Sequence, residues 1–131
     1  MTEVFADTSA FLALLNAADS HHRRAATAIR KLRSRQVSLV TTSYVLVETC
    51  ALIDNRLGTV EVRRFHNEFE PLLDVVWVTR TEHDAGMDLL SRRKRRVSLV
   101  DAVSFFVARR RGIGEAFAYD RDFAEEGFDL V

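Results

Sequence analysis

The sequence predicts a single α/β domain in which a mostly parallel central sheet of four or five strands is flanked by helices on both faces. Short β-branched runs alternate with longer helical stretches along the whole chain. Strands separated by helices form right-handed βαβ crossovers, which cover both faces of a parallel sheet. The chain has 131 residues, one proline and no linker-like segment. This is the size of one domain, residues 1–131.

Composition and charge exclude several classes of protein. Hydrophobic residues make up 47% of the chain and charged residues 29%, which is typical of a folded globular protein. No apolar run approaches the ~18 residues of a membrane span, and no secretory signal is visible. Cys50 is the single cysteine, so we expect a reducing, cytoplasmic setting. Basic and acidic residues both number 19, so any binding to nucleic acid must come from local patches.

The first part of the chain contains two expected strands and three helices. Glu3–Asp7 is a strand candidate, and Thr8–Ala17 follows it as a helix. A second helix is expected over Ser20–Arg35, because apolar residues recur on one of its faces. Val37–Val40 is the second strand. Hydroxyl side chains after this strand provide an N-cap for a helix over Tyr44–Asn55.

The middle of the chain continues the alternation. A helix begins at Gly58 or Thr59 and ends at Pro71. Asp74–Val78 has the composition of a strand buried within a parallel sheet. Thr81–Asp84 has the spacing of a capping box and is therefore expected to open the next helix.

The last part of the chain contains a helix and two strands. Ser98–Asp101 also has capping-box spacing, and it opens a helix over Val100–Arg111 with Gly112 as its C-cap. Glu115–Tyr119 is the next strand. Phe128–Val131 adds a short strand at the edge of the sheet.

Acidic residues are expected to gather at one edge of this sheet. Parallel α/β sheets bind ligands beyond the carboxyl ends of their strands, near the point where the strand order reverses. Asp7 and Asp120 end two of the expected strands, and Asp122 follows shortly after. Glu48 and Asp101 lie near the starts of helices that follow loops on the same edge.

Several of these acids also have a purely structural explanation. Asp7 is placed to cap a helix, Asp101 to complete a capping box and Asp120 to form an Asx-turn. Glu48 is different, because it interrupts an apolar helix face and has no lysine or arginine three or four residues away. A buried carboxylate without a partner is costly, so Glu48 needs a tertiary partner such as an arginine or a metal ion.

Taken together, the acids favour a metal site. Converging carboxylates repel one another and raise their own pKa values. A divalent ion relieves this repulsion, and ligands that are all oxygen suit Mg²⁺ or Mn²⁺. A water on such an ion can attack a phosphodiester, so the acids predict a metal-dependent nuclease.

A run of basic residues offers a surface for the substrate. It consists of Arg92, Arg93, Lys94, Arg95 and Arg96. Because the run stands directly before Ser98 and Asp101, we expect it to contact phosphates of the substrate; the alternative is a solvated face. Arg109–Arg111 closes the following helix, where cations also suit the helix dipole.

Four short motifs, in this order and spacing, resemble those of PIN domains, and more narrowly those of VapC toxins. The motifs are Asp7-Thr8-Ser9-Ala10, Glu48, Ser98-Leu-Val-Asp101-Ala102 and Tyr119-Asp120-Arg121-Asp122-Phe123. The resemblance implies an acidic cluster of Asp7, Glu48, Asp101 and Asp120 with Asp122 as an accessory. It also implies a site hydroxyl from Thr8 or Ser9. The implied activity is that of a Mg²⁺- or Mn²⁺-dependent endoribonuclease, usually a homodimer, held inactive by a small cognate antitoxin.

One position departs from the family pattern, and three other interpretations remain open. Many relatives have Thr or Ser two residues before the last aspartate, where this chain has Ala118. A PIN-like domain that only binds RNA or protein is the main alternative. A receiver-like phosphoacceptor needs a lysine near the sheet edge, and the two lysines are Lys31 and Lys94. A haloacid-dehalogenase-type phosphatase would need an aspartate at Ser9.

Overall fold

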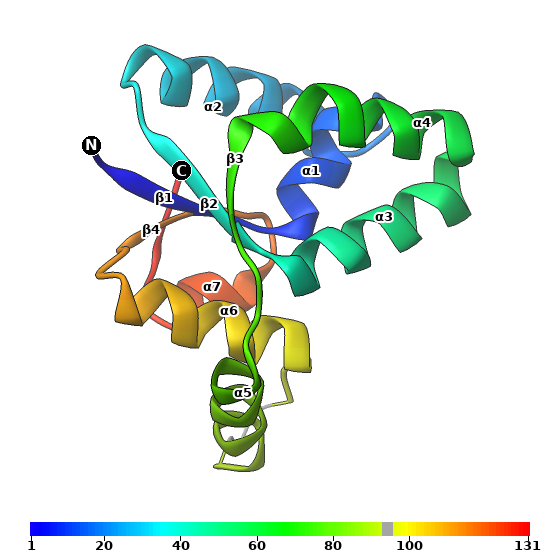
Figure 1. The fold of residues 1–131 in the computed structure, drawn as a ribbon. Coiled ribbons are helices and arrows are strands. Elements are labelled where there is room, and N and C mark those ends of the chain that lie inside the picture. The colour runs from blue at the N-terminus through cyan, green and yellow to red at the C-terminus, as the bar shows by residue number, and fades with distance from the viewer. Residues whose placement is uncertain (93–95) are drawn as a thin grey trace.

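The computed structural model describes residues 1–92 and 96–131, and it is built around a five-stranded parallel sheet (Figure 1). The strands are β1 (Glu3–Ala6), β2 (Ser38–Thr42), β3 (Leu73–Val76), β4 (Glu115–Phe117) and β5 (Asp129–Leu130). Their order across the sheet is β3-β2-β1-β4-β5, and each neighbouring pair is parallel. The chain builds outward from β1 first to one side and then to the other. The strand order therefore reverses between β1 and β4, where such folds bind ligands.

Helices cover both faces of the sheet, which confirms the predicted α/β class (Figure 1). They are α1 (Thr8–Leu15), α2 (His22–Ser34), α3 (Ser43–Leu57), α4 (Thr59–Arg64), α5 (Arg80–Arg92), α6 (Leu99–Arg110) and α7 (Arg121–Glu125). Successive side chains of β1 point to opposite faces. Val4 packs with α1 and α2, and Phe5 packs with α6 and α7. Among the described residues, no helix combines the length and the apolar composition needed to cross a membrane.

A cluster of aromatic rings fixes α6 and α7 against the sheet. Phe123 of α7 stacks on Phe5 of β1, with ring centroids 5.9 Å apart. The same ring meets Phe105 of α6 edge to face at 5.0 Å. All three side chains are fully buried, and burying each one contributes about 2–3 kcal/mol. This packing sets where the N-termini of α6 and α7 lie relative to the end of β1.

The strand predicted at Asp74–Val78 exists as β3, but it is not the fully buried strand that its composition predicted. β3 is an edge strand with β2 as its neighbour. The Asp74 carboxylate accepts a hydrogen bond from Arg111, 2.9 Å from its guanidinium nitrogen. Trp77 lies beyond the strand and is 69% exposed. An apolar run shows that a strand is favourable, but it carries no information on the order of strands across the sheet.

The start of α5 also differs from the prediction. The capping box that opens α5 is Thr79 with Glu82, not Thr81 with Asp84: the Thr79 hydroxyl accepts from the Glu82 N–H at 3.2 Å, and Glu82 accepts from the Thr79 N–H at 2.9 Å. Asp84 instead pairs with Arg80. Both pairs, Thr79 with Glu82 and Thr81 with Asp84, have capping-box spacing. The first pair is used because Glu82 becomes buried.

The helix expected up to Pro71 is divided, and a short helix was not predicted. α4 is followed by a π-helical turn, Phe65–Phe69, and by a 3₁₀ turn, Glu70–Leu72. The unpredicted helix, α7, begins directly after Asp120. Its five residues are too few for helical periodicity to be recognised.

Candidate active site

The reversal of strand order brings Asp7 and Asp120 to the same edge of the sheet. Asp7 follows β1 directly, and its N–H donates to the carbonyl of Phe117 at 3.1 Å, which extends the β1–β4 pairing by one residue. Asp120 comes three residues after β4 and is the N-cap of α7. Two acids far apart in the sequence therefore lie at the same edge of the sheet, at the switch point.

Asp7 is buried and held by Ser9. It caps α1, and its Oδ2 accepts from the Ser9 N–H at 3.2 Å and from the Ser9 hydroxyl at 2.8 Å. The same hydroxyl accepts from the N–H of Tyr119 at 2.9 Å. Ser9 therefore ties the Asp7 carboxylate to the segment that leads into Asp120. Ala118 has no hydroxyl and packs in the core, so this tie comes from Ser9.

Thr8, the other predicted site hydroxyl, has a different role in the structure. Its Oγ1 forms a hydrogen bond of 3.0 Å with Oγ1 of Thr49 on α3, and both residues are buried. This bond joins the first turn of α1 to the helix that carries Glu48. Thr8 thereby fixes the position of α3 relative to Asp7.

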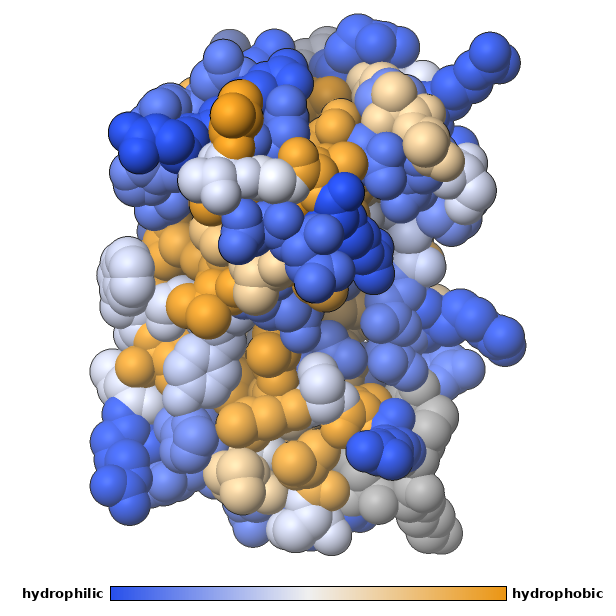
Figure 2. All heavy atoms as spheres, turned by 90° about the vertical axis from the view of Figure 1, so that its right-hand side faces the viewer, coloured by the Kyte–Doolittle hydropathy of each residue, from blue (hydrophilic) through white to orange (hydrophobic). Residues whose placement is uncertain are grey.

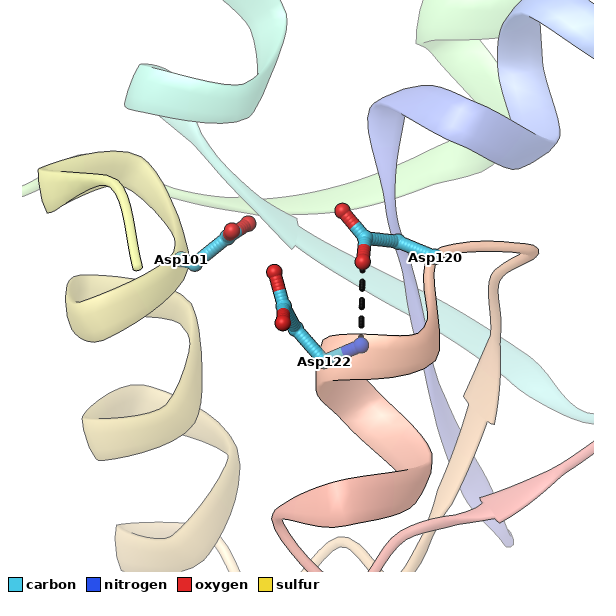
Figure 3. A group of neighbouring side chains, drawn as sticks. All are labelled: Asp101, Asp120 and Asp122. Atoms are coloured by element: carbon cyan, nitrogen blue, oxygen red, sulfur yellow. Dashed lines mark hydrogen bonds between the residues drawn. The ribbon is translucent and has the colours of Figure 1, made fainter. Parts of the chain in front are cut away.

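Asp101, Asp120 and Asp122 form the tightest group of acids (Figure 3). One carboxylate oxygen from each lies within 4.8 Å of the other two. Asp101 projects from α6, Asp122 from α7, and Asp120 from the turn before α7, so that the three side chains converge. Asp120 accepts from the Asp122 N–H at 2.9 Å, which makes it both a helix cap and a member of the group.

Asp101 lies in the first turn of α6, which Ser98 caps. The Ser98 hydroxyl accepts from the Asp101 N–H at 3.0 Å, which is the serine half of the predicted capping box. The Asp101 carboxylate, however, points toward Asp120 and Asp122 (Figure 3). Asp122 was predicted only as an accessory to the site, whereas the structure groups its carboxylate with those of Asp101 and Asp120. The signal in the sequence was the spacing of two residues between Asp122 and the N-cap Asp120.

Burial and the charges of neighbouring acids raise the pKa values of Asp7 and Asp101 above the usual value for aspartate. The pKa of Asp7 is raised to about 6: burial is the main cause, hydrogen bonds from Ser9 oppose the rise, and the neighbouring Glu48 charge adds to it. Burial is also the main cause that raises the pKa of Asp101 to about 7, followed by the charges of Asp7, Asp120, Asp122 and Glu48. Glu48 is half-buried on α3. It faces the group without belonging to its closest part.

This donor set fits a divalent cation. The ligands would all be carboxylate oxygens, which Mg²⁺ and Mn²⁺ prefer. Among residues 1–92 and 96–131, no lysine or arginine forms an ion pair with Asp7, Glu48 or Asp101. Within the described residues, these three carboxylates therefore have no ion pair that would offset their mutual repulsion. A bound metal ion would offset it.

The predicted RNA-binding run is only partly described. Arg93, Lys94 and Arg95 lie outside the described residues. Arg92 is exposed and pairs with Asp88 at 3.0 Å, and Arg96 is exposed. The other basic run, Arg109–Arg111, is engaged in structural ion pairs: Arg109 with Glu126, Arg110 with Glu82, and Arg111 with both Glu3 and Asp74.

Comparisons with known proteins agree with this geometry. A family model for the PIN domain matches residues 4–128. The chain is 36% identical over 127 residues to the 23S rRNA-specific endonuclease VapC20 of Mycobacterium tuberculosis, and the match covers 95% of each protein. The crystal structure of that VapC20, a Sarcin-Ricin loop cleaving toxin, is similar with a TM-score of 0.84 at 34% identity over 95% of both chains.

More distant structures share the fold. VapBC2 from Rickettsia felis, bound to a DNA fragment, matches with a TM-score of 0.73 at 10% identity, over 99% of this chain and 98% of that one. The chain therefore belongs to the PIN domain family and, by its likeness to VapC20, to the VapC toxins within it. Its class is that of a VapC-type endoribonuclease, as the motifs predicted.

Proposed function

We propose that this protein is a Mg²⁺- or Mn²⁺-dependent endoribonuclease whose ion is held by Asp7, Glu48, Asp101, Asp120 and Asp122. The observation that carries the proposal is the convergence of Asp101, Asp120 and Asp122. Burial, followed by the charges of the neighbouring acids, raises the pKa of Asp101 to about 7. When bound, the ion would activate a water molecule and neutralise charge on the phosphodiester. A metal site explains why buried carboxylates are gathered at a cost to folding.

The surrounding residues orient the carboxylates. Ser9 donates to Asp7 and fixes the direction of its Oδ2. Ser98 caps α6 and so positions Asp101 in its first turn. Near neutral pH a large share of the Asp101 carboxyl groups hold a proton, because the pKa is about 7. Metal binding must release that proton, so metal affinity should rise between about pH 6 and 8.

For the substrate we propose a looped segment of ribosomal RNA. The support is the likeness to VapC20, which is a 23S rRNA-specific, Sarcin-Ricin loop cleaving toxin. Loops expose base edges that A-form helices hide, so a small domain can read them. Arg92–Arg96 would hold the phosphate backbone beside Asp101, and their removal should weaken RNA binding and flatten its salt dependence.

The test is cleavage of a labelled sarcin–ricin loop RNA in the presence of Mn²⁺. Asp7→Asn should cleave at least about a hundredfold more slowly, because the ion contributes several kcal/mol to the transition state. The matched control is Asp84→Asn, which neutralises an exposed acid on α5 and should cleave at the wild-type rate. EDTA should abolish cleavage. Equal cleavage by Asp7→Asn and wild type would contradict the site, and RNA that binds without being cut would favour the non-catalytic alternative.

For the partners we propose a homodimer and a small cognate antitoxin, and we propose that they act in the cytoplasm. Figure 2 shows the side of the molecule on which α3 and α4 lie, with apolar side chains gathered in a band across it. Val47 on α3 and Val60 on α4 are 69% and 78% exposed. Exposed apolar patches commonly mark protein–protein interfaces. A second copy of the chain would cover this one. Val60→Asp should shift the mass measured by light scattering from dimer to monomer, and an unchanged dimer would contradict this surface.

The proposal of an antitoxin partner is supported by the membership of this chain in the VapC toxins. A separate apolar cavity of about 280 Å³ could receive its apolar side chains. The cavity lies between α1, α2 and the β3 edge, and Phe11, Leu14 and Ile29 are among its lining residues. Leu14→Asp should then weaken antitoxin binding while RNA cleavage by the free toxin persists. Unchanged antitoxin affinity would exclude this cavity.

A further inference from the structure

Helix α2 presents a strongly basic surface that the acidic site does not use. Its segment His22–Ser34 contains five arginines and lysines and no acid. Three of them, Arg23, Arg24 and Lys31, line a cavity of about 340 Å³ together with Tyr119. All three are exposed, and within the described residues none of them forms an ion pair. The cavity is thus lined by three cations that form no ion pair with the described part of the chain.

Tyr119 forms the aromatic wall of this cavity. The guanidinium carbon of Arg24 lies 5.3 Å from the centre of the Tyr119 ring, and the ring of His21 stacks on it at 4.6 Å with an interplanar angle of 4°. The Tyr119 hydroxyl oxygen is buried and has no hydrogen-bond partner among the described residues. Asp19 also lies near Tyr119, and its carboxylate accepts from the His21 N–H at 2.8 Å.

An unpartnered buried hydroxyl indicates a missing acceptor or donor. Leaving such a group without a hydrogen bond costs free energy, so native proteins rarely do it. Next to two arginines and a lysine, the complementary ligand is an anion. Arginine, lysine and tyrosine side chains are common donors to phosphate oxygens in nucleic-acid complexes.

The cavity adjoins the acidic site through the chain itself. Tyr119 directly precedes Asp120. Its N–H donates to the Ser9 hydroxyl, which in turn donates to Asp7. A strand of RNA with one phosphodiester at the acids would therefore pass the cavity with a neighbouring part of its backbone. The acids repel that backbone, so cations beside them are needed to hold it.

We propose that the cavity between α2 and Tyr119 is a subsite for a backbone phosphate of the RNA substrate, next to the phosphodiester that is cleaved. Arg24 and Lys31 supply the charge, and the Tyr119 hydroxyl donates a hydrogen bond to a phosphate oxygen. The subsite rests on the proposed ribonuclease function and adds a second RNA contact, separate from Arg92–Arg96. It places the substrate across the β4–α7 turn.

The test compares two pairs of substitutions that remove equal charge from the same helix. The subsite pair is Arg24→Gln with Lys31→Gln, and the control pair is Arg30→Gln with Arg33→Gln. Arg30 and Arg33 are exposed like the subsite pair but do not line this cavity. The labelled loop RNA is titrated in Mg²⁺ by fluorescence anisotropy, with every protein carrying Asp7→Asn to prevent cleavage.

We expect the subsite pair to weaken RNA binding by at least about tenfold and to lower the slope of log Kd against log salt by about 0.7, the value for one single-strand phosphate contact. The control pair should change the affinity by less than about twofold, since it removes no contact. Equal losses in both pairs, or no RNA binding by the parent protein, would overturn the subsite.

Tyr119→Phe tests the hydroxyl while keeping the ring. Its melting temperature should equal or exceed that of the parent, because an unpartnered buried hydroxyl is lost. Its RNA affinity should nevertheless fall about tenfold, as expected for a hydrogen bond to a charged group. Full affinity would remove the hydroxyl from the subsite. The cleavage assay tests the ribonuclease function independently of the binding assay. RNA that binds through this subsite but is never cut would contradict the ribonuclease function without contradicting the subsite.

Discussion

Replacing Asp7 by asparagine should stabilise the metal-free protein at alkaline pH. The pKa of Asp7 rises from 3.8 to about 6, mainly because the carboxyl group is buried. At about 1.4 kcal/mol for each pH unit, the ionised carboxylate costs folding about 3 kcal/mol. Asparagine removes the charge and keeps an oxygen that can accept from Ser9. The substitution that abolishes the metal site should therefore raise the free energy of unfolding.

The sign of the pH dependence follows from proton binding. Between about pH 4 and 6 the folded protein holds the Asp7 proton while the unfolded chain has released it. The free energy of unfolding therefore falls as the pH rises through this window. The advantage of Asp7→Asn should be below about 1 kcal/mol at pH 4 and reach about 3 kcal/mol at pH 8.

The assay is urea unfolding in EDTA at pH 4 and pH 8, with Asp84→Asn as the matched control. Asp84 is exposed and pairs with Arg80 on the surface, so its variant should stay within about 0.5 kcal/mol of the wild type. Adding Mn²⁺ at about 100 times its Kd should raise the free energy of unfolding of the wild type by about 2.7 kcal/mol. The difference in stability between the wild type and Asp7→Asn should therefore become smaller. A wild type as stable as Asp7→Asn at pH 8 in EDTA would refute the reasoning.

Three further predictions concern packing and orientation. Gly86→Ala places a methyl group against the buried side chain of Val103, where α5 crosses α6, and should destabilise the protein by about 1–3 kcal/mol in urea unfolding. Phe123→Ala removes the ring that joins α7 to the sheet and should cost about 3–5 kcal/mol. Ser9→Ala removes the hydroxyl that donates to Asp7 and accepts from Tyr119, so the pKa of Asp7 and with it the onset of metal-dependent cleavage should move to higher pH; an unchanged pH profile would contradict the orienting role.

The acidic cluster was predictable because each of its members follows a local rule. Asp7 comes directly after a strand, and Asp101 lies in the first turn of a helix that a serine caps. Parallel topology then brings such positions to one edge of the sheet without further information. Glu48 was identified because a carboxylate on an apolar helix face needs a partner. Alternation of strands and helices was sufficient for the fold class.

Other features depend on contacts that no local pattern contains. The edge position of β3 follows from the strand order, and Trp77 is exposed because the strand ends before it. Thr79 and Thr81 are both acceptable N-caps, and the choice depends on Glu82 becoming buried. The cavity at Tyr119 joins residues about a hundred positions apart, so no local pattern predicts it.

The most direct test of the central claim is a calorimetric titration of the protein with Mn²⁺. Wild type and Asp84→Asn should bind Mn²⁺ with equal affinity and release protons near pH 7, because the pKa of Asp101 is about 7. Asp101→Asn should bind at least about tenfold more weakly and release fewer protons. Equal affinity and equal proton release in Asp101→Asn would contradict the claim that these carboxylates form the metal site.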